Sequence, residues 1–208
     1  MQKLIIALVA MASLAAGLYF SGIMRQEIPV TARVFEPVRA VKPFELTDHN
    51  DQPLTNAYFK DKWSLIFLGY THCPDVCPTT LAKLANVYPK LKNAGIDNVQ
   101  VLFVSVDPQR DTAERLKEYT AYFNEEFTSA TGFHADLFPF VRSLGLMYSM
   151  TEDTTQEDYA VGHSGSIVLV NPQGGLHAMF KPIEEIGGIP NVDMAILKTD
   201  FQTLVGRF

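Results

Sequence analysis

Two short apolar runs constrain the fold of this chain more than any other feature. They are WSLIFLG, at Trp63–Gly69, and VLFVSV, at Val101–Val106. Short runs of this kind are typical of strands that are buried on both faces in a parallel sheet. A further strand is expected at Ser166–Val170, followed by a turn and by a strand at Leu176–Phe180 that pairs back as a hairpin. The sequence therefore predicts an α/β fold with a mixed central sheet.

The segments between these strands have helical patterns. After Pro78, apolar residues recur at helical spacing, and Pro89 is expected to kink or shorten the helix. The stretch TAERLKEYTAYF, residues 112–123, is amphipathic, with Asp111 or Thr112 placed to cap it. The other expected elements are a hairpin of short strands within residues 44–54, a helix from about residue 138 and a last helix over residues 191–205.

The N-terminal part of the chain has the pattern of a membrane anchor. The run Leu4–Ile23 contains 20 residues and no charge. At about 1.5 Å per residue, a helix of this length reaches across a bilayer core of about 30 Å. We expect a single transmembrane helix in residues 1–25 and a linker in residues 26–37, which show no period. A cleaved signal peptide is the alternative, because the small residues Ala15–Gly17 resemble a cleavage site.

The charge of the chain argues against nucleic acid as a partner. The chain has 17 basic and 23 acidic side chains, a formal net charge of −6. The part after Arg25 is more acidic still, because the first 25 residues contain two basic residues and no acidic one. An acidic domain repels phosphate backbones. Two cysteines allow at most one internal disulfide, so the domain must be stabilised by its core.

Both cysteines lie in the stretch GYTHCPDVCPTT, directly after the first apolar run. Each precedes a proline, which favours an extended conformation for Cys73 and Cys77. Pro78 suits the first position of a helix, and this would make Cys77 the N-cap. The positive end of the helix dipole favours a thiolate there. The pair therefore suits a redox-active disulfide or a metal site, and two buried structural thiols are the simpler alternative.

Three motifs, in this order, give the chain a family resemblance. They are YTHCPDVCPT (Tyr70–Thr79), SVDPQRDT (Ser105–Thr112) and the pair His163–Ser164. The chain resembles the Sco/SenC proteins, which are thioredoxin-like copper chaperones of cytochrome c oxidase assembly. The resemblance extends from about Val38 to the C-terminus. It implies that residues 38–208 form a thioredoxin-like, three-layer copper-binding domain with a mixed central sheet.

The resemblance also implies a copper site made from Cys73, Cys77 and His163. Thiolates are the ligands that Cu(I) prefers, and an added imidazole suits Cu(II) as well. Two residues depart from the family pattern. Gly162 stands where the family often has an acidic residue, which leaves the partner of His163 undefined, and Asp51 stands where a turn glycine is usual.

The other residues that suit metal ligation have simpler interpretations. His72 is the alternative ligand, although a neighbour that tunes the thiol pKa explains it more simply. Asp107 is expected either to support the site or dock a partner, or to cap a turn. The remaining histidines are expected at the surface and three methionines in packing roles. These residues are His49, His134 and His177, and Met147, Met150 and Met179.

The resemblance implies delivery of copper to the dinuclear centre of cytochrome c oxidase subunit II, or to another copper protein. It places the domain on the periplasmic side of a bacterial inner membrane. A thiol-disulfide reductase that uses Cys73 and Cys77 is the second hypothesis. Redox thioredoxins have two residues between their cysteines, whereas this chain has three. A peroxiredoxin-like peroxidase needs a threonine three residues before its reactive cysteine, but Thr71 is only two before Cys73.

Overall fold

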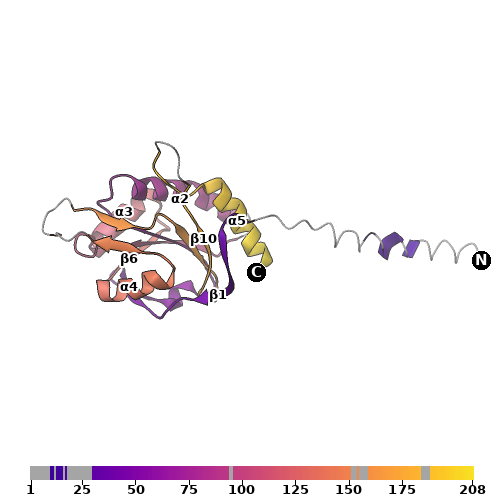
Figure 1. The fold of residues 1–208 in the computed structure, drawn as a ribbon, viewed down its shortest axis with the longest axis horizontal. Helices are drawn as coiled ribbons and strands as arrows, with labels where there is room; N and C mark the ends of the chain where they lie inside the picture. Colours follow the sequence, from indigo (N-terminus) through magenta and orange to yellow (C-terminus); the bar gives the residue numbers. More distant parts are fainter. Residues whose placement is uncertain are drawn as a thin grey trace, which may run out of the picture.

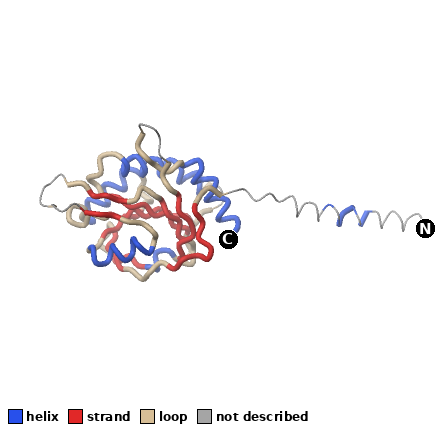
Figure 2. The backbone as a smooth tube through the Cα atoms, viewed as in Figure 1, coloured by secondary structure: helices blue, strands red, loops and turns tan. Residues whose placement is uncertain are grey.

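The computed structural model describes residues 10–11, 13–15, 17, 30–93, 96–150, 154, 159–183 and 188–208. From Val30 onward the described residues form a mixed sheet of eight strands, in the order β1-β10-β9-β4-β5-β6-β2-β3, with helices packed on it (Figures 1 and 2). The strands of this sheet are β1 (Arg33–Ala40), β2 (Glu45–Asp48), β3 (Pro53–Thr55), β4 (Trp63–Gly69), β5 (Val99–Ser105), β6 (Thr128–Thr131), β9 (Ile167–Val170) and β10 (Gly175–Phe180).

The predicted apolar runs form the centre of the sheet. Strand β4 pairs with β5 in parallel and with β9 in antiparallel orientation. Every residue of these three strands is buried, because helices cover both faces. The α/β fold with a mixed central sheet is therefore confirmed, as is the β9–β10 hairpin.

Helices form a layer on each side of the sheet. They are η1 (Asn56–Phe59), α2 (Val76–Lys92), α3 (Ala113–Phe123), α4 (His134–Ser143) and α5 (Met194–Arg207). Figure 1 shows α2, α3 and α5 on one side of the sheet and α4 on the other. On the α4 side, the Phe44 ring packs against Phe140 of α4 at a centroid distance of 4.1 Å and against Phe59 of η1 at 5.6 Å.

The helix boundaries differ from the expected ones at three places. Asp75, not Cys77, is the N-cap of α2, because the Asp75 carbonyl already accepts the Thr79 N–H. Cys77 consequently lies in the first turn. Pro89 does not end α2, which continues for three more residues, and α4 begins at His134 rather than at residue 138.

Strand β1 lies in a region that the sequence predicts to be partly linker. Residues 33–37 of that expected linker belong to β1, which pairs with β10. Phe35 of β1 is only 5% exposed. Most of the strand is exposed and its pairing is irregular between Val34 and Arg39, so the sequence shows no alternation there. The sequence favours an edge strand for His177, and this expectation is wrong, because β1 covers β10 and His177 therefore lies in an interior strand of the sheet.

The predicted membrane anchor lies mostly outside the described residues. Among the residues that the structure describes, no helix combines the length and the apolar character needed to cross a bilayer.

Candidate metal centre

The cysteine loop begins where β4 ends and closes into the first turn of α2. Cys73 is 9% exposed and Cys77 is fully buried, and the two are not joined by a disulfide. The Cys73 N–H donates to the Tyr70 carbonyl at 3.2 Å, which tightens the loop. Gly69 leaves room for the second thiol, because a Cβ at this position would lie 2.7 Å from Cys77 Sγ. Both sulfurs therefore lie at the carboxyl end of the parallel strands β4 and β5.

His163 approaches the thiols from a second, smaller sheet. It ends strand β8 (Val161–His163), which pairs with β7 (Tyr148–Met150). Its Nε2 lies 3.3 Å from Cys77 Sγ, and its Nδ1 donates to the Ser164 carbonyl at 3.2 Å. That hydrogen bond leaves the Nε2 lone pair directed at the cysteines. The ligand atoms of Cys73, Cys77 and His163 all lie within 4.8 Å of one another, so the structure brings the three predicted residues together.

The partner of His163 is a backbone carbonyl, not a carboxylate. The departure at Gly162 fits this arrangement, because a Cβ there would lie 2.7 Å from Ser149 Oγ on the facing strand. A larger residue at Gly162 would therefore displace Ser149 or open the pairing of β7 with β8.

The two thiols differ in acidity. The pKa of Cys73 is lowered to about 4, chiefly because the Cys77 thiol donates a hydrogen bond to the Cys73 thiolate. Burial raises the pKa of Cys77 above its ordinary range. Without metal the pair therefore holds one thiolate and one thiol, and a metal that binds both sulfurs must displace the Cys77 proton.

A buried carboxylate fixes the start of the cysteine loop. Asp111 is 1% exposed and accepts three hydrogen bonds, from the Thr71 N–H at 2.9 Å, from Thr71 Oγ1 at 2.6 Å and from Ser105 Oγ at 2.6 Å. Arg115 Nε donates to Thr71 Oγ1 at 2.7 Å. The sequence indicated Asp111 only as a possible helix cap, but Thr112 caps α3. The place of Asp111 in the SVDPQRDT motif is the one sequence signal that it does more than cap a helix.

Asp107 has no exposed surface, so it does not present a carboxylate to a partner. His72 lies on the cysteine loop with its Nδ1 3.8 Å from Asp111 Oδ1. It groups with Asp107 and Asp111, and not with the two cysteines, within the described residues. Both of those carboxylates already accept hydrogen bonds, so this second group is occupied by the protein itself.

The sequence predicts surface positions for the remaining histidines, and the structure shows them half-buried. His49 Nδ1 accepts from the Ser129 N–H at 3.0 Å. His134 Nδ1 and the Tyr148 hydroxyl form a hydrogen bond at 2.8 Å, and the His177 ring packs edge-on against Trp63 at 5.3 Å. Among the methionines, Met179 is buried and Met147 is 68% exposed.

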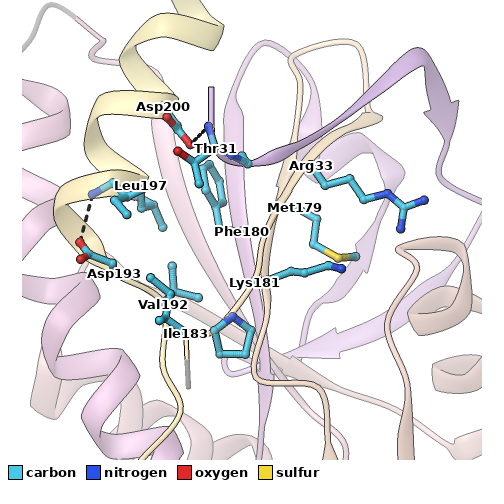
Figure 3. Close-up of a pocket in the computed structure, with 13 residues that line it drawn as sticks. Thr31, Arg33, Met179, Phe180, Lys181, Ile183, Val192, Asp193, Leu197 and Asp200 are labelled. Atoms are coloured by element: carbon cyan, nitrogen blue, oxygen red, sulfur yellow. Dashed lines mark hydrogen bonds between the residues drawn. The ribbon is translucent and has the colours of Figure 1, made fainter. Parts of the chain in front are cut away.

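A cavity of about 530 Å³ lies away from the cysteines, between the start of β1, the end of β10 and α5 (Figure 3). Asp200 of α5 is 3% exposed, and its carboxylate accepts the N–H groups of Thr31 and Ala32 at 2.9 and 2.7 Å. This contact fixes the point at which the described chain enters the domain.

Comparisons with a family model and with known proteins all indicate the same family. The family model described as SCO1/SenC matches residues 34–191. A putative copper-binding protein of Stutzerimonas stutzeri is 35% identical over 162 residues, which are 78% of this chain and 79% of that protein. The mitochondrial SCO1 homolog 1 of Arabidopsis thaliana is 38% identical over 132 residues, which are 63% of this chain but only 39% of that protein.

Two solved structures of copper-bound proteins resemble the fold. Arabidopsis thaliana ScoI with copper bound aligns with a TM-score of 0.71 and 29% identity, over 81% of this chain and 100% of that one. Bradyrhizobium japonicum ScoI with copper bound aligns with a TM-score of 0.61 and 34% identity, over 68% and 89% of the two chains.

Proposed function

The chain belongs to the SCO1/SenC family, and we propose that it is a copper chaperone that binds one copper ion through Cys73, Cys77 and His163. The observation that carries this proposal is the convergence of two sulfurs and one imidazole nitrogen within 4.8 Å of one another. Two thiolates suit Cu(I), and the imidazole adds the nitrogen that Cu(II) prefers. The Nδ1–H bond to the Ser164 carbonyl orients the ring for this role.

The proposed recipient is the dinuclear copper centre of cytochrome c oxidase subunit II or another copper protein. The ligand set supports a transfer role, because the ligands come from separate segments and can be released from copper one after another. Cys73 lies in the cysteine loop, Cys77 in the first turn of α2 and His163 at the end of β8. The half-buried His163 is the ligand that an incoming protein reaches first.

We further propose that residues 1–25 tether the domain to a bacterial inner membrane, with the domain in the periplasm. The strand register indicates where the tether would join the domain. Arg33 pairs with Met179, Met179 with Val168, and Val168 with Ile66, so Arg33 is level with Ile66 in the middle of β4. These three pairings are all antiparallel, so β1 runs opposite to β4 and the residues before Arg33 extend toward the carboxyl end of β4. The chain therefore enters the domain at the sheet edge that carries the cysteine loop, and the tether would hold that edge near the membrane.

A second candidate function is reduction of disulfides in the recipient. The lowered pKa of Cys73 favours it, because a thiolate is the attacking species. In that reaction the two thiols would become a disulfide while the partner disulfide becomes two thiols. The position of His163 Nε2, 3.3 Å from Cys77 Sγ, favours the metal site.

Copper loading of variants in which one histidine is replaced separates the two functions. The domain should bind one copper per chain, and alkylation of the thiols should abolish binding. His163→Ala should keep Cu(I), which two thiolates satisfy, and lose stable Cu(II) together with its thiolate-to-copper absorption. His72→Ala, on the cysteine loop itself, is the matched control and should keep both states. If His163→Ala retained wild-type Cu(II) binding and lost only disulfide reduction, the reductase would be the better assignment.

Loaded protein should also transfer copper to a copper-free subunit II domain, and transfer should stop when the thiols are alkylated. For the tether, a periplasm-dependent reporter fused after residue 30 should be active and stay with the membrane fraction. A shortened, soluble product would show instead that the segment is a cleaved signal.

A further inference from the structure

The position of His163 relative to the cysteines is not set by the main sheet. The cysteine loop continues from β4, in the eight-stranded sheet, whereas β8 pairs with β7 in a separate sheet of two strands. Three residues, among them Gly165, separate His163 from the main-sheet strand β9. Contacts between side chains must therefore hold the histidine at ligand distance from the thiols.

A cluster of three residues, Asp107, Arg110 and Tyr159, joins β8 to the end of β5. Arg110 Nε donates to Asp107 Oδ2 at 2.5 Å, and the Tyr159 hydroxyl donates to Asp107 Oδ1 at 2.5 Å. A terminal nitrogen of Arg110 donates to the Tyr159 carbonyl at 2.9 Å, and the guanidinium lies 3.5 Å from the centre of the Tyr159 ring. Tyr159, four residues before His163, is thus held by its hydroxyl, its ring and its backbone.

The same arginine also borders the cysteine loop. Its guanidinium lies 5.6 Å from the centre of the Tyr70 ring, and that ring packs edge-on against His163 at 5.9 Å. The Tyr70 carbonyl accepts the Cys73 N–H. Through Tyr70, the cluster therefore connects the strand that carries the histidine with the loop that carries the cysteines.

The burial of the cluster indicates a geometric role. Asp107 is fully buried and the Arg110 side chain is 12% exposed. A buried ion pair adds little net stability, because removing both charges from water costs about as much as their attraction returns. The hydrogen bonds within the cluster nevertheless restrict its three side chains to a narrow range of positions relative to one another. Neither carboxylate oxygen of Asp107 is left for a partner protein, since one is bonded to Arg110 and the other to Tyr159.

We propose that Asp107, Arg110 and Tyr159 are positioning residues that hold His163 in place as a copper ligand. This inference rests on the proposed function. Residues that orient a metal ligand typically change metal affinity by about 10- to 100-fold when they are replaced. The loss should concern Cu(II), which needs the imidazole, and spare Cu(I), which the two thiolates satisfy.

Two changes test this role. Tyr159→Phe removes the bond to Asp107 and keeps the ring under Arg110. The double change Asp107→Asn with Arg110→Gln removes both charges together, so that no lone buried charge remains. Tyr122→Phe is the control, because Tyr122 is 84% exposed. We expect the double variant to bind Cu(II) about tenfold more weakly with a shifted thiolate-to-copper absorption, and Tyr159→Phe to show a smaller loss of the same kind. Cu(I) affinity should be unchanged in both variants, as should all copper binding in the control.

The metal-free protein gives an independent readout. The NMR signals of the His163 ring depend on its packing against Tyr70, and they should shift in both variants and stay in place in the control.

The outcomes separate this inference from the proposed function. If His163→Ala itself leaves Cu(II) affinity unchanged, the ligand assignment is wrong. If His163→Ala weakens Cu(II) binding but the two variants bind Cu(II) as the wild type does, only the positioning role is wrong. If the double variant does not fold, the test rests on Tyr159→Phe alone, through its Cu(II) affinity and the NMR signals of its His163 ring.

Discussion

At the scale of single residues, Gly69 shows how tightly the site is built into the core. An added Cβ would lie 2.6 Å from Cε2 of Phe103 and 2.7 Å from Cys77 Sγ. Both neighbours are fully buried, so neither can move into solvent. A change of one methyl group at the end of β4 therefore acts on the fold and on a proposed ligand together.

Gly69→Ala should destabilise the domain by about 1–3 kcal/mol through overpacking, and it should displace Cys77 Sγ. Denaturant unfolding measures the first effect, and copper titration measures the second. Gly206→Ala in α5 is the matched control, because nothing lies within 4 Å of its added Cβ. That variant should be unchanged or more stable by up to about 1 kcal/mol. Equal stability of the two variants would contradict the packing argument.

The acidity of Cys73 can be tested by alkylation. A lowered pKa means that the thiolate persists as the pH falls, until protonation near the pKa of about 4. The rate of Cys73 alkylation in the reduced, metal-free protein should therefore stay high down to about pH 5 and fall below it. In the unfolded chain, the midpoint should return to about pH 8.5. A midpoint above pH 7 in the folded protein would show that the hydrogen bond from Cys77 does not stabilise the thiolate.

The sequence predicted the three proposed ligands but not the residues that support them. Cys73, Cys77 and His163 are recognisable by type and motif. Asp111 contacts Thr71 across 40 positions, and Tyr159 contacts Asp107 across 52. Pairings of this kind depend on which loops the topology brings together, and neither spacing nor residue type encodes them locally.

At the scale of elements, burial decided what the sequence could predict. Strands β4, β5 and β9 are buried along their whole length and read as unbroken apolar runs. Strand β1 has one buried residue among eight, and β6 is a four-residue strand of threonine, serine and alanine, so neither gives a periodic signal. Among the described strands, the short β7 and β8 pair only with each other, and their position depends on side-chain contacts to α4 and to the Asp107 cluster.

Asp111 joins two elements, the cysteine loop and the end of β5. Asp111→Asn should cost about 1.5–3 kcal/mol, because an amide cannot accept all three hydrogen bonds that the carboxylate accepts. Asp193→Asn is the matched control. Asp193 caps α5 by accepting from two backbone N–H groups, and asparagine serves equally well as an N-cap. Urea unfolding should therefore separate the two variants, and similar losses would contradict the role given to Asp111.

At the scale of the whole molecule, β1 closes one edge of the sheet. It covers β10, buries Phe35 and places Thr31 and Ala32 on the Asp200 carboxylate. Without β1, the backbone of β10 becomes an open edge, and Asp200 stays buried without its two donors. The functional domain should therefore begin before β1 and not after it.

A chain that starts at Val30 should fold and unfold cooperatively. A chain that starts at Val41 should be less stable by at least about 3 kcal/mol, from the loss of the Phe35 side chain and the Asp200 contacts, and should aggregate more readily. Thermal unfolding and light scattering measure both effects. Equal stability would show that β1 is dispensable and that the linker extends to residue 40.

The central claim is that Cys73, Cys77 and His163 hold one copper ion, and X-ray absorption at the copper edge tests it most directly. The ion loaded as Cu(II) should show two sulfur neighbours and at least one imidazole nitrogen, whereas His163→Ala, which should hold copper as Cu(I), should show the two sulfur neighbours without an imidazole signal. A first shell without sulfur, or an imidazole signal that is unchanged in His163→Ala, would contradict the claim.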